Sequence, residues 1–163
     1  MNFYRQLVVV NASITRPANT TTYAAGDVIG SATTGVMTLT SAARVATAAG
    51  FISSIVLVDD TNAALNLDAD IFFYDTAPAA QADNVAFNPS YAEQLRCLGV
   101  ASIIGTDGKE GTSNVTYNGI MPSPGKIDFV SVTANLFAVM VARNAYIPAS
   151  GEIFALRVYI NQA

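Results

Sequence analysis

Four aspartates in the middle of the chain are the residues whose type and spacing come closest to a metal site. Asp59, Asp60, Asp68 and Asp70 supply the hard oxygen ligands that Ca²⁺ prefers. Their spacing does not match an EF-hand loop, which requires Asp-x-Asp-x-Asp-Gly and a later Glu. The Asp-Asp-Thr-Asn sequence at 59–62 is typical of a turn. We therefore expect solvated turn residues here, with no metal and no cofactor.

The nucleophiles and bases of the commonest catalytic sites are missing from this sequence. It contains no histidine, which excludes Ser-His-Asp and Cys-His arrangements. Cys97 is the single cysteine, so neither an internal disulfide nor a cysteine-based zinc site can form, and we expect it to be a small core residue. No glycine-rich phosphate motif is present. A glycosidase would need a facing pair of carboxylates, and nothing singles one out. We expect no enzyme activity.

The charge pattern also restricts the partners. Eight Lys and Arg against twelve Asp and Glu give a net charge of −4, and the arginines are scattered along the chain. A nucleic-acid-binding domain shows a clustered basic patch instead. The longest apolar stretch, residues 136–142, is far shorter than the ~20 residues of a membrane-spanning helix. We expect neither nucleic acid nor a membrane as a partner.

The low charge is informative in a second way. Only 12% of the residues are charged and 52% are hydrophobic, whereas soluble domains carry roughly 25% charge. Residues 1–163 fit a single domain. Such a composition favours a protein whose surface is partly covered by other subunits.

Short apolar runs rich in Val, Ile, Phe and Tyr, separated by Gly, Pro, Asn and Asp, predict many short strands. The expected strands are residues 7–13, 27–31, 36–39, 51–59, 66–74, 98–104, 114–120, 126–133, 136–143 and 152–161. Such a series without alternating helices predicts an all-β fold, an antiparallel β-sandwich of the jelly-roll kind.

Local signals complete the outline. Ser90 and Glu93 have the spacing of a capping box and predict one helical turn within residues 89–96. The Ala-rich residues 42–49 are a weaker candidate for a second turn, because they include Thr47 and end at Gly50. Asp107-Gly108 is placed where a chain could reverse between two strands. We therefore expect at most one or two short helical turns.

Several predicted strands are apolar on both faces. In residues 152–161 one face presents Phe, Leu, Val and Ile, and the other presents Ile153, Ala155, Arg157 and Tyr159. Residues 136–143 are likewise apolar on both sides. Antiparallel sheets usually have one polar outer face. A neighbouring subunit is the simplest cover for the second face. The alternative is a closed barrel or a long loop of the same chain lying over the sheet.

An ordered series of segments resembles the capsid decoration, or cement, proteins of tailed bacteriophages. The likeness begins with ITRPANTTTYAAGDVIG at residues 14–30 and continues through GFI at 50–52, IFFY at 71–74 and DNVAF at 83–87. It covers roughly residues 12 to 105 and is weak beyond them. The resemblance implies a jelly-roll-like homotrimer on the outer surface of the virion. There it would bind the major capsid protein and stabilise contacts between capsid subunits.

The segment before Gly26 is a candidate extended arm. Pro17 favours an extended Arg16, and a Thr- and Asn-rich stretch follows. Residues 1–26 could therefore pack on a neighbour. An ordinary first strand followed by a surface loop fits the same sequence. Because aromatic residues and arginine are favoured at interface hot spots, we predict that the subunit or capsid interface includes Phe3, Tyr4, Arg5, Arg16, Ile153, Arg157 and Tyr159.

Two other functions fit an all-β domain. A fibre or tail receptor-binding module would bind glycans through an exposed aromatic platform, for which Phe72, Phe73 and Tyr74 are the candidates. Strand alternation should bury at least one of these rings. A small β-sandwich hydrolase is disfavoured by the absence of histidine.

Overall fold

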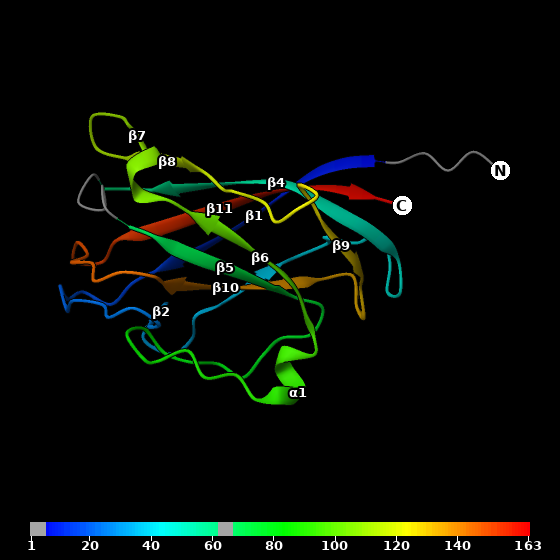
Figure 1. The fold of residues 1–163 in the computed structure, drawn as a ribbon, viewed down its shortest axis with the longest axis horizontal. Helices are drawn as coiled ribbons and strands as arrows, with labels where there is room; N and C mark the ends of the chain where they lie inside the picture. The colour runs from blue at the N-terminus through cyan, green and yellow to red at the C-terminus, as the bar shows by residue number, and fades with distance from the viewer. Residues whose placement is uncertain (1–5, 62–66) are drawn as a thin grey trace.

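The computed structural model describes residues 6–61 and 67–163, which form two antiparallel β-sheets packed face to face (Figure 1). Sheet 1 has the order β1 (Gln6–Thr15), β11 (Ile153–Gln162), β4 (Ala49–Asp59), β8 (Val115–Asn118) and β7 (Lys109–Glu110), with β9 (Ile127–Val130) paired to the other half of β4. Sheet 2 has the order β2 (Val28–Ile29), β10 (Leu136–Ala142), β5 (Ala69–Tyr74) and β6 (Cys97–Ile103), with β3 (Val36–Leu39) also paired to β10.

The strand order is that of a jelly roll. The pair β2 and β3 fills one strand position beside β10, and β8 and β9 fill one position beside β4. Counted in this way, the first, eighth, third and sixth positions along the chain form sheet 1, and the second, seventh, fourth and fifth form sheet 2. This arrangement contains two Greek keys. The predicted all-β sandwich is confirmed, and each of the ten expected strands overlaps an observed one.

The turn predictions meet different outcomes. The capping box is present at α1 (Tyr91–Gln94), where the Ser90 hydroxyl accepts from the Glu93 N–H and the Glu93 carboxylate accepts from the Ser90 N–H. Residues 42–49 contain no helix, and Thr47 has a positive φ of 62°. Asp107 ends a 3₁₀ turn, η1 (Gly105–Asp107), rather than a hairpin. The reason is that β6 and β8 belong to different sheets, so this connection must cross the edge of the sandwich.

The core lies between the sheets and is built from one face of each strand. From β11 it receives Phe154, Leu156, Val158 and Ile160, all with no exposed surface. Burying a side chain of this size stabilises the fold by ~1.5–3 kcal/mol. Side chains alternate between the two faces of a strand, so the remaining residues lie on the outer faces of the two sheets. What covers these outer faces determines which residues a partner could reach.

Candidate interaction surface

The outer face of sheet 2 is sealed by the chain itself. Residues 75–96, which connect β5 to β6, run across this face and include α1 (Figure 1). Beneath them lies a second apolar cluster in which the ring of Phe87 packs 4.9 Å from that of Phe72. Its buried members are Val28, Tyr74, Val139 and Val141. The apolar second face of β10 therefore needs no neighbour, and the loop alternative is the correct one for this sheet.

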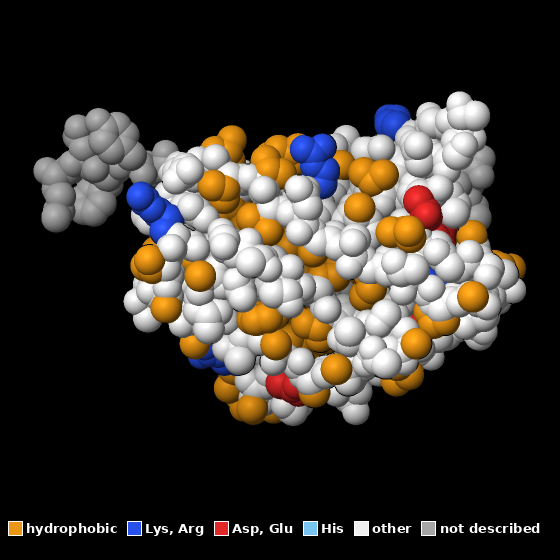
Figure 2. All heavy atoms as spheres, turned by 180° about the vertical axis from the view of Figure 1, so that it is seen from behind, with side chains coloured by type: hydrophobic (Ala, Val, Ile, Leu, Met, Phe, Trp, Pro, Cys, Tyr) orange, Lys and Arg blue, Asp and Glu red, His pale blue; other side chains and the backbone are white. Residues whose placement is uncertain are grey.

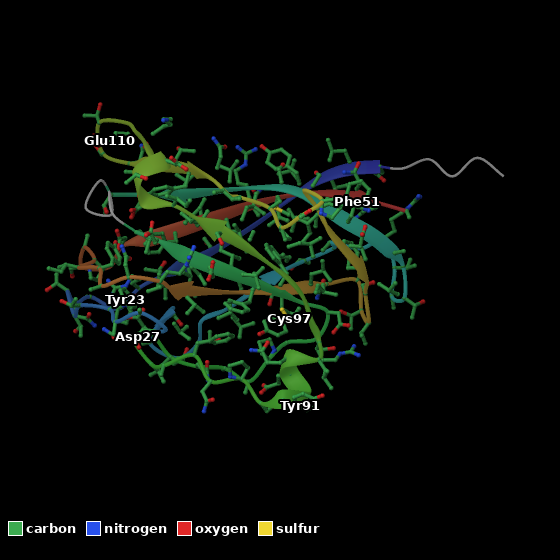
Figure 3. The ribbon with its side chains drawn as sticks, in the orientation of Figure 1. Tyr23, Asp27, Phe51, Tyr91, Cys97 and Glu110 are labelled. Atoms are coloured by element: carbon green, nitrogen blue, oxygen red, sulfur yellow. The ribbon has the colours of Figure 1, made fainter. Side chains whose placement is uncertain are left out.

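Backbone hydrogen bonds hold residues 75–96, which we call the covering segment, over sheet 2. The Asn84 N–H donates to the Val28 carbonyl at 2.9 Å, and the Val28 N–H donates to the Val85 carbonyl at 2.8 Å. The Phe87 N–H donates to the Gly26 carbonyl at 2.8 Å. Cys97 packs at the margin of the same cluster, as Figure 3 shows, and burial raises the pKa of its thiol. The sequence predicted a small core residue, whereas Cys97 is half-buried and packs against the second cluster outside the main core.

Arg16 fastens the covering segment to the sandwich, which corrects its expected role as an interface anchor. Its side chain is fully buried and forms a salt bridge of 3.1 Å with Asp83. The guanidinium also donates to the Ala149 carbonyl at 3.0 Å and to the Tyr23 hydroxyl, which itself donates to Asp83. All of these partners belong to the same chain, so the Arg16 guanidinium is buried and bonded within its own fold.

The described part of the candidate N-terminal arm also packs on its own chain. Residues 6–15 form β1, which pairs with β11 over ten positions. Beyond it the Tyr23 N–H donates to the Tyr146 carbonyl, and the Gly26 N–H donates to the Ala142 carbonyl. The first strand followed by a loop is thus the arrangement seen. Phe3, Tyr4 and Arg5 lie outside the described residues.

The outer face of sheet 1 differs because its apolar side chains meet solvent. We call this surface the open face. Its exposed members are Leu7, Val9, Val130 and Ile153, with exposed fractions of 59%, 41%, 61% and 38%. Its half-buried members are Phe51, Val56, Val58, Ala155 and Tyr159.

Strand register gathers three of the predicted interface residues on the open face. Ile153, Arg157 and Tyr159 alternate along β11 on the side away from the core. Arg157 lies opposite Asn11 on one side and Val56 on the other. Its guanidinium stands 5.8 Å from the centre of the Tyr159 ring. The residues from β1 and β4 were missed, and their own alternation would have found them once the strand order was known.

Charged groups are sparse on this surface. Lys126 and Asp128 pair with each other at 2.7 Å, and the Lys126 ammonium lies 5.2 Å from the centre of the Phe51 ring. Arg157 is the one charged residue of β11. Figure 2, which shows the molecule from behind, also has few acidic and basic side chains in view. An outer face with few charges and several exposed apolar side chains favours contact with another polypeptide.

A depression of about 410 Å³ lies at the end of the open face beside Phe51, a residue labelled in Figure 3. Its lining residues are Ala49, Gly50, Phe51, Lys126, Asp128, Asn161 and Ala163. The open face therefore includes a concavity that can receive a protruding side chain. Pockets in an interface are where anchor residues are usually found.

The aspartates considered for calcium are used within the fold. Asp59 is fully buried rather than solvated, beside Glu152, and burial raises the pKa of Asp59 to about 7. The Thr61 hydroxyl lies 3.2 Å from Asp59 and 2.9 Å from Glu152, and the Tyr146 hydroxyl donates to Glu152 at 2.5 Å. Within residues 6–61 and 67–163, no three His, Cys, Asp or Glu side chains are grouped to hold a metal ion.

The aromatic platform considered for a glycan-binding module is not formed. Phe73 and Tyr74 are completely buried, as strand alternation predicted for at least one ring. Phe72 is half-buried against Phe87. In the described part of the chain, no helix has the length and apolar character needed to cross a membrane.

Comparisons with known proteins leave the family open. No protein-family model matches the chain, and no curated protein matches it. Among solved structures it is similar to a chain of Desmodium yellow mottle tymovirus, at 9% identity and a TM-score of 0.29 over 99% of this chain and 83% of that one. A chain of turnip yellow mosaic virus gives 10% identity and a TM-score of 0.29, over 98% and 93% of the two chains.

Other matches are equally distant. A chain of deformed wing virus, a honeybee pathogen, gives 9% identity and a TM-score of 0.32 over 98% of this chain and 48% of that one. The catalytic domain of a GH87 alpha-1,3-glucanase gives 11% identity and a TM-score of 0.31 over 95% and 27%. At these scores the matches do not establish a function, which must be argued from the chain's own surfaces.

Proposed function

We propose that this chain is a structural virion protein that decorates the outer surface of a tailed-phage head. It binds the major capsid protein through the open face of sheet 1 and stabilises contacts between neighbouring capsid subunits. The sequence resemblance adds a homotrimeric state to this proposal. Its work is binding, without catalysis.

One observation carries the proposal, namely the contrast between the two outer faces. The chain uses residues 75–96 to cover the apolar face of sheet 2. It leaves Leu7, Val9 and Ile153 exposed on sheet 1. Because apolar surface is stabilised by removal from water, the open face gains from a contact with another protein. The resemblance of residues 12 to 105 to decoration proteins names the kind of partner.

The expected binding free energies fit a protein that holds neighbouring capsid subunits together. A standard interface buries ~1,600 Å², and apolar area contributes ~25 cal/mol per Å². Much of that gain offsets the loss of translational, rotational and side-chain freedom on association. An oligomer that grips several capsid subunits at once gains from a high effective concentration, so contacts of modest strength hold firmly.

The test is binding to purified heads that lack this protein. We compare the parent chain with Val56→Glu, which places a charge on the open face, and with Tyr91→Glu, which places one on the exposed α1 across the molecule. We expect Val56→Glu to reduce occupancy at least about tenfold, since burying a carboxylate in an interface costs its desolvation even with Arg157 on the neighbouring strand, and Tyr91→Glu to bind like the parent. Equal binding by all three proteins would contradict the proposal.

A further inference from the structure

One edge of sheet 1 is long, regular and unpaired in the described residues. Strand β1 has ten residues, and its pairing with β11 continues without a register shift from Gln6 to Thr15. It ends the strand order of sheet 1, so its other side has no partner strand among residues 6–61 and 67–163. In Figure 1 this strand runs along the far side of the molecule.

The hydrogen-bond alternation shows which groups face the free side. The Arg16 N–H donates to the Glu152 carbonyl at 2.9 Å, one step beyond the last pair of the register. In an antiparallel ladder, alternate residues direct both N–H and C=O to one neighbour. The even-numbered residues of β1 therefore bond to β11. The N–H and C=O groups directed to the free side belong to Leu7, Val9, Asn11, Ser13 and Thr15, and all five residues are exposed.

The other strands at the sheet edges are short or irregular, and both features blunt an edge in natural proteins. Strand β7 has two residues, both charged, and β2 also has two. Strand β6 carries a register shift in its pairing with β5, next to Phe73. By contrast, β1 contains no charged residue, no proline and no bulge. An edge with these properties is a template for another strand.

We propose that β1 is a self-association site at which two copies of this chain pair antiparallel through their β1 edges. In the register centred on Asn11, the two Asn11 residues face each other, Val9 faces Ser13, and Leu7 faces Thr15. No like charges are opposed, and the amide of Asn11 can both donate and accept.

The symmetry of this contact explains why a second copy suits the edge. A two-fold pairing is self-complementary and closed, so both free edges are covered at once and no further chain can add there. It also places the two open faces side by side as one continuous surface. Within the proposed trimer, the same contact would link one trimer to the next.

The first test is sedimentation of the purified full chain across a range of concentrations, with no capsid present. Asn11→Pro removes an N–H on the free side and leaves the bonds to β11 intact, whereas Val9→Lys adds an edge charge. We expect each to weaken self-association at least about tenfold. The control Val56→Glu alters the centre of the open face and should leave the association unchanged. Thermal unfolding verifies that each variant is folded, and Val9→Lys suffices if Asn11→Pro is not.

Hydrogen exchange gives the residue-level readout. The amides of Val9, Asn11 and Ser13 should be protected at high concentration and should exchange on dilution, while those of Val8 and Val10 stay protected in both states. A parent chain that remains a single copy at high concentration would overturn the inference, as would loss of association in Val56→Glu but not in the edge variants. Head binding is measured separately, so failure here leaves the proposed function standing, and the reverse also holds.

Discussion

The two outer faces of this sandwich are built from similarly apolar strands, but one is covered by the chain itself and the other is exposed to solvent. Strands β10 and β11 both place apolar residues on their outer sides. Over β10 the chain adds residues 75–96 and buries Val139 and Val141. Over β11 it adds nothing among the described residues, and Ile153 stays 38% exposed. The chain covers one apolar face with its own residues and leaves the other exposed. We therefore infer that the exposed face is the one that a partner covers.

The largest expected effect on stability comes from breaking the salt bridge that holds residues 75–96 over sheet 2. Arg16→Ala leaves the buried carboxylate of Asp83 without its cation. Removing one member of a buried pair costs about 3–5 kcal/mol, so we expect a marked fall in the free energy of unfolding and binding of a hydrophobic dye to the uncovered cluster. The measurement is denaturant unfolding together with dye fluorescence.

A double variant serves as the control. Arg16→Met with Asp83→Asn removes both charges and should recover much of the lost stability. If Arg16→Ala unfolds at the same denaturant concentration as the parent, the salt bridge does not fasten the covering segment.

A smaller effect is expected at Phe87, the aromatic contact of the covering segment with sheet 2. Because Phe87 is only partly buried, Phe87→Ala should cost about 2 kcal/mol, below the range for a fully buried ring. Calorimetric unfolding measures the loss. The matched change Phe51→Ala on the open face should cost less, and an equal cost would remove the distinction between the faces.

The third prediction concerns the buried carboxylates, which lie at the end of the sandwich and belong to neither face. The folded state raises the pKa of Asp59 from 3.8 to about 7 by burial. The folded state therefore binds the extra proton more strongly, and stability is highest below pH 4 for this group and is lost as the pH rises to 7. We expect the unfolding temperature to be several degrees higher at pH 5 than at pH 8.

Asp59→Asn removes the titrating group and should flatten this dependence between pH 5 and pH 8. The hydrogen bond from the Thr61 N–H can still be accepted by the amide oxygen. An unchanged slope in this variant would assign the pH dependence to another group.

The smallest effect on stability is expected on the open face itself. Val56→Glu changes a half-buried outer position beside Arg157, and surface changes usually alter stability by less than about 0.5 kcal/mol. The unfolding temperature should stay close to that of the parent although head binding falls. A strongly destabilised variant would mean that this face supports the fold rather than a partner.

Much of the fold could be predicted from the sequence, because its signals are local. Alternation along β11 gave the buried row of Phe154, Leu156 and Val158, and the Ser90–Glu93 spacing gave the one capped helical turn. Turn residues placed the strand ends closely enough for ten of the eleven strands in the described residues to be found, and only the two-residue β7 was missed. The strand order itself could not be predicted, although the rules of chain connection limit the possible orders.

The surfaces could not be predicted in the same way. Periodicity shows that Val139 and Arg157 both lie on outer faces, but it does not say what covers either. Apart from α1, the cover over sheet 2 has no strand or helix pattern of its own, and the pairing of Arg16 with Asp83 joins residues far apart in the chain. Asp59 likewise lies beside Glu152, which is far from it in the chain. Long-range contacts of this kind decide which residues remain available to a partner.

The most direct test of the central claim is side-chain footprinting of the protein bound to purified heads, compared with the free protein. We predict that labelling of Phe51, Val56 and Tyr159 falls on binding while labelling of Tyr91 and Leu95 on the sealed side does not change. Protection of Tyr91 and Leu95, with the open face still labelled, would contradict the account.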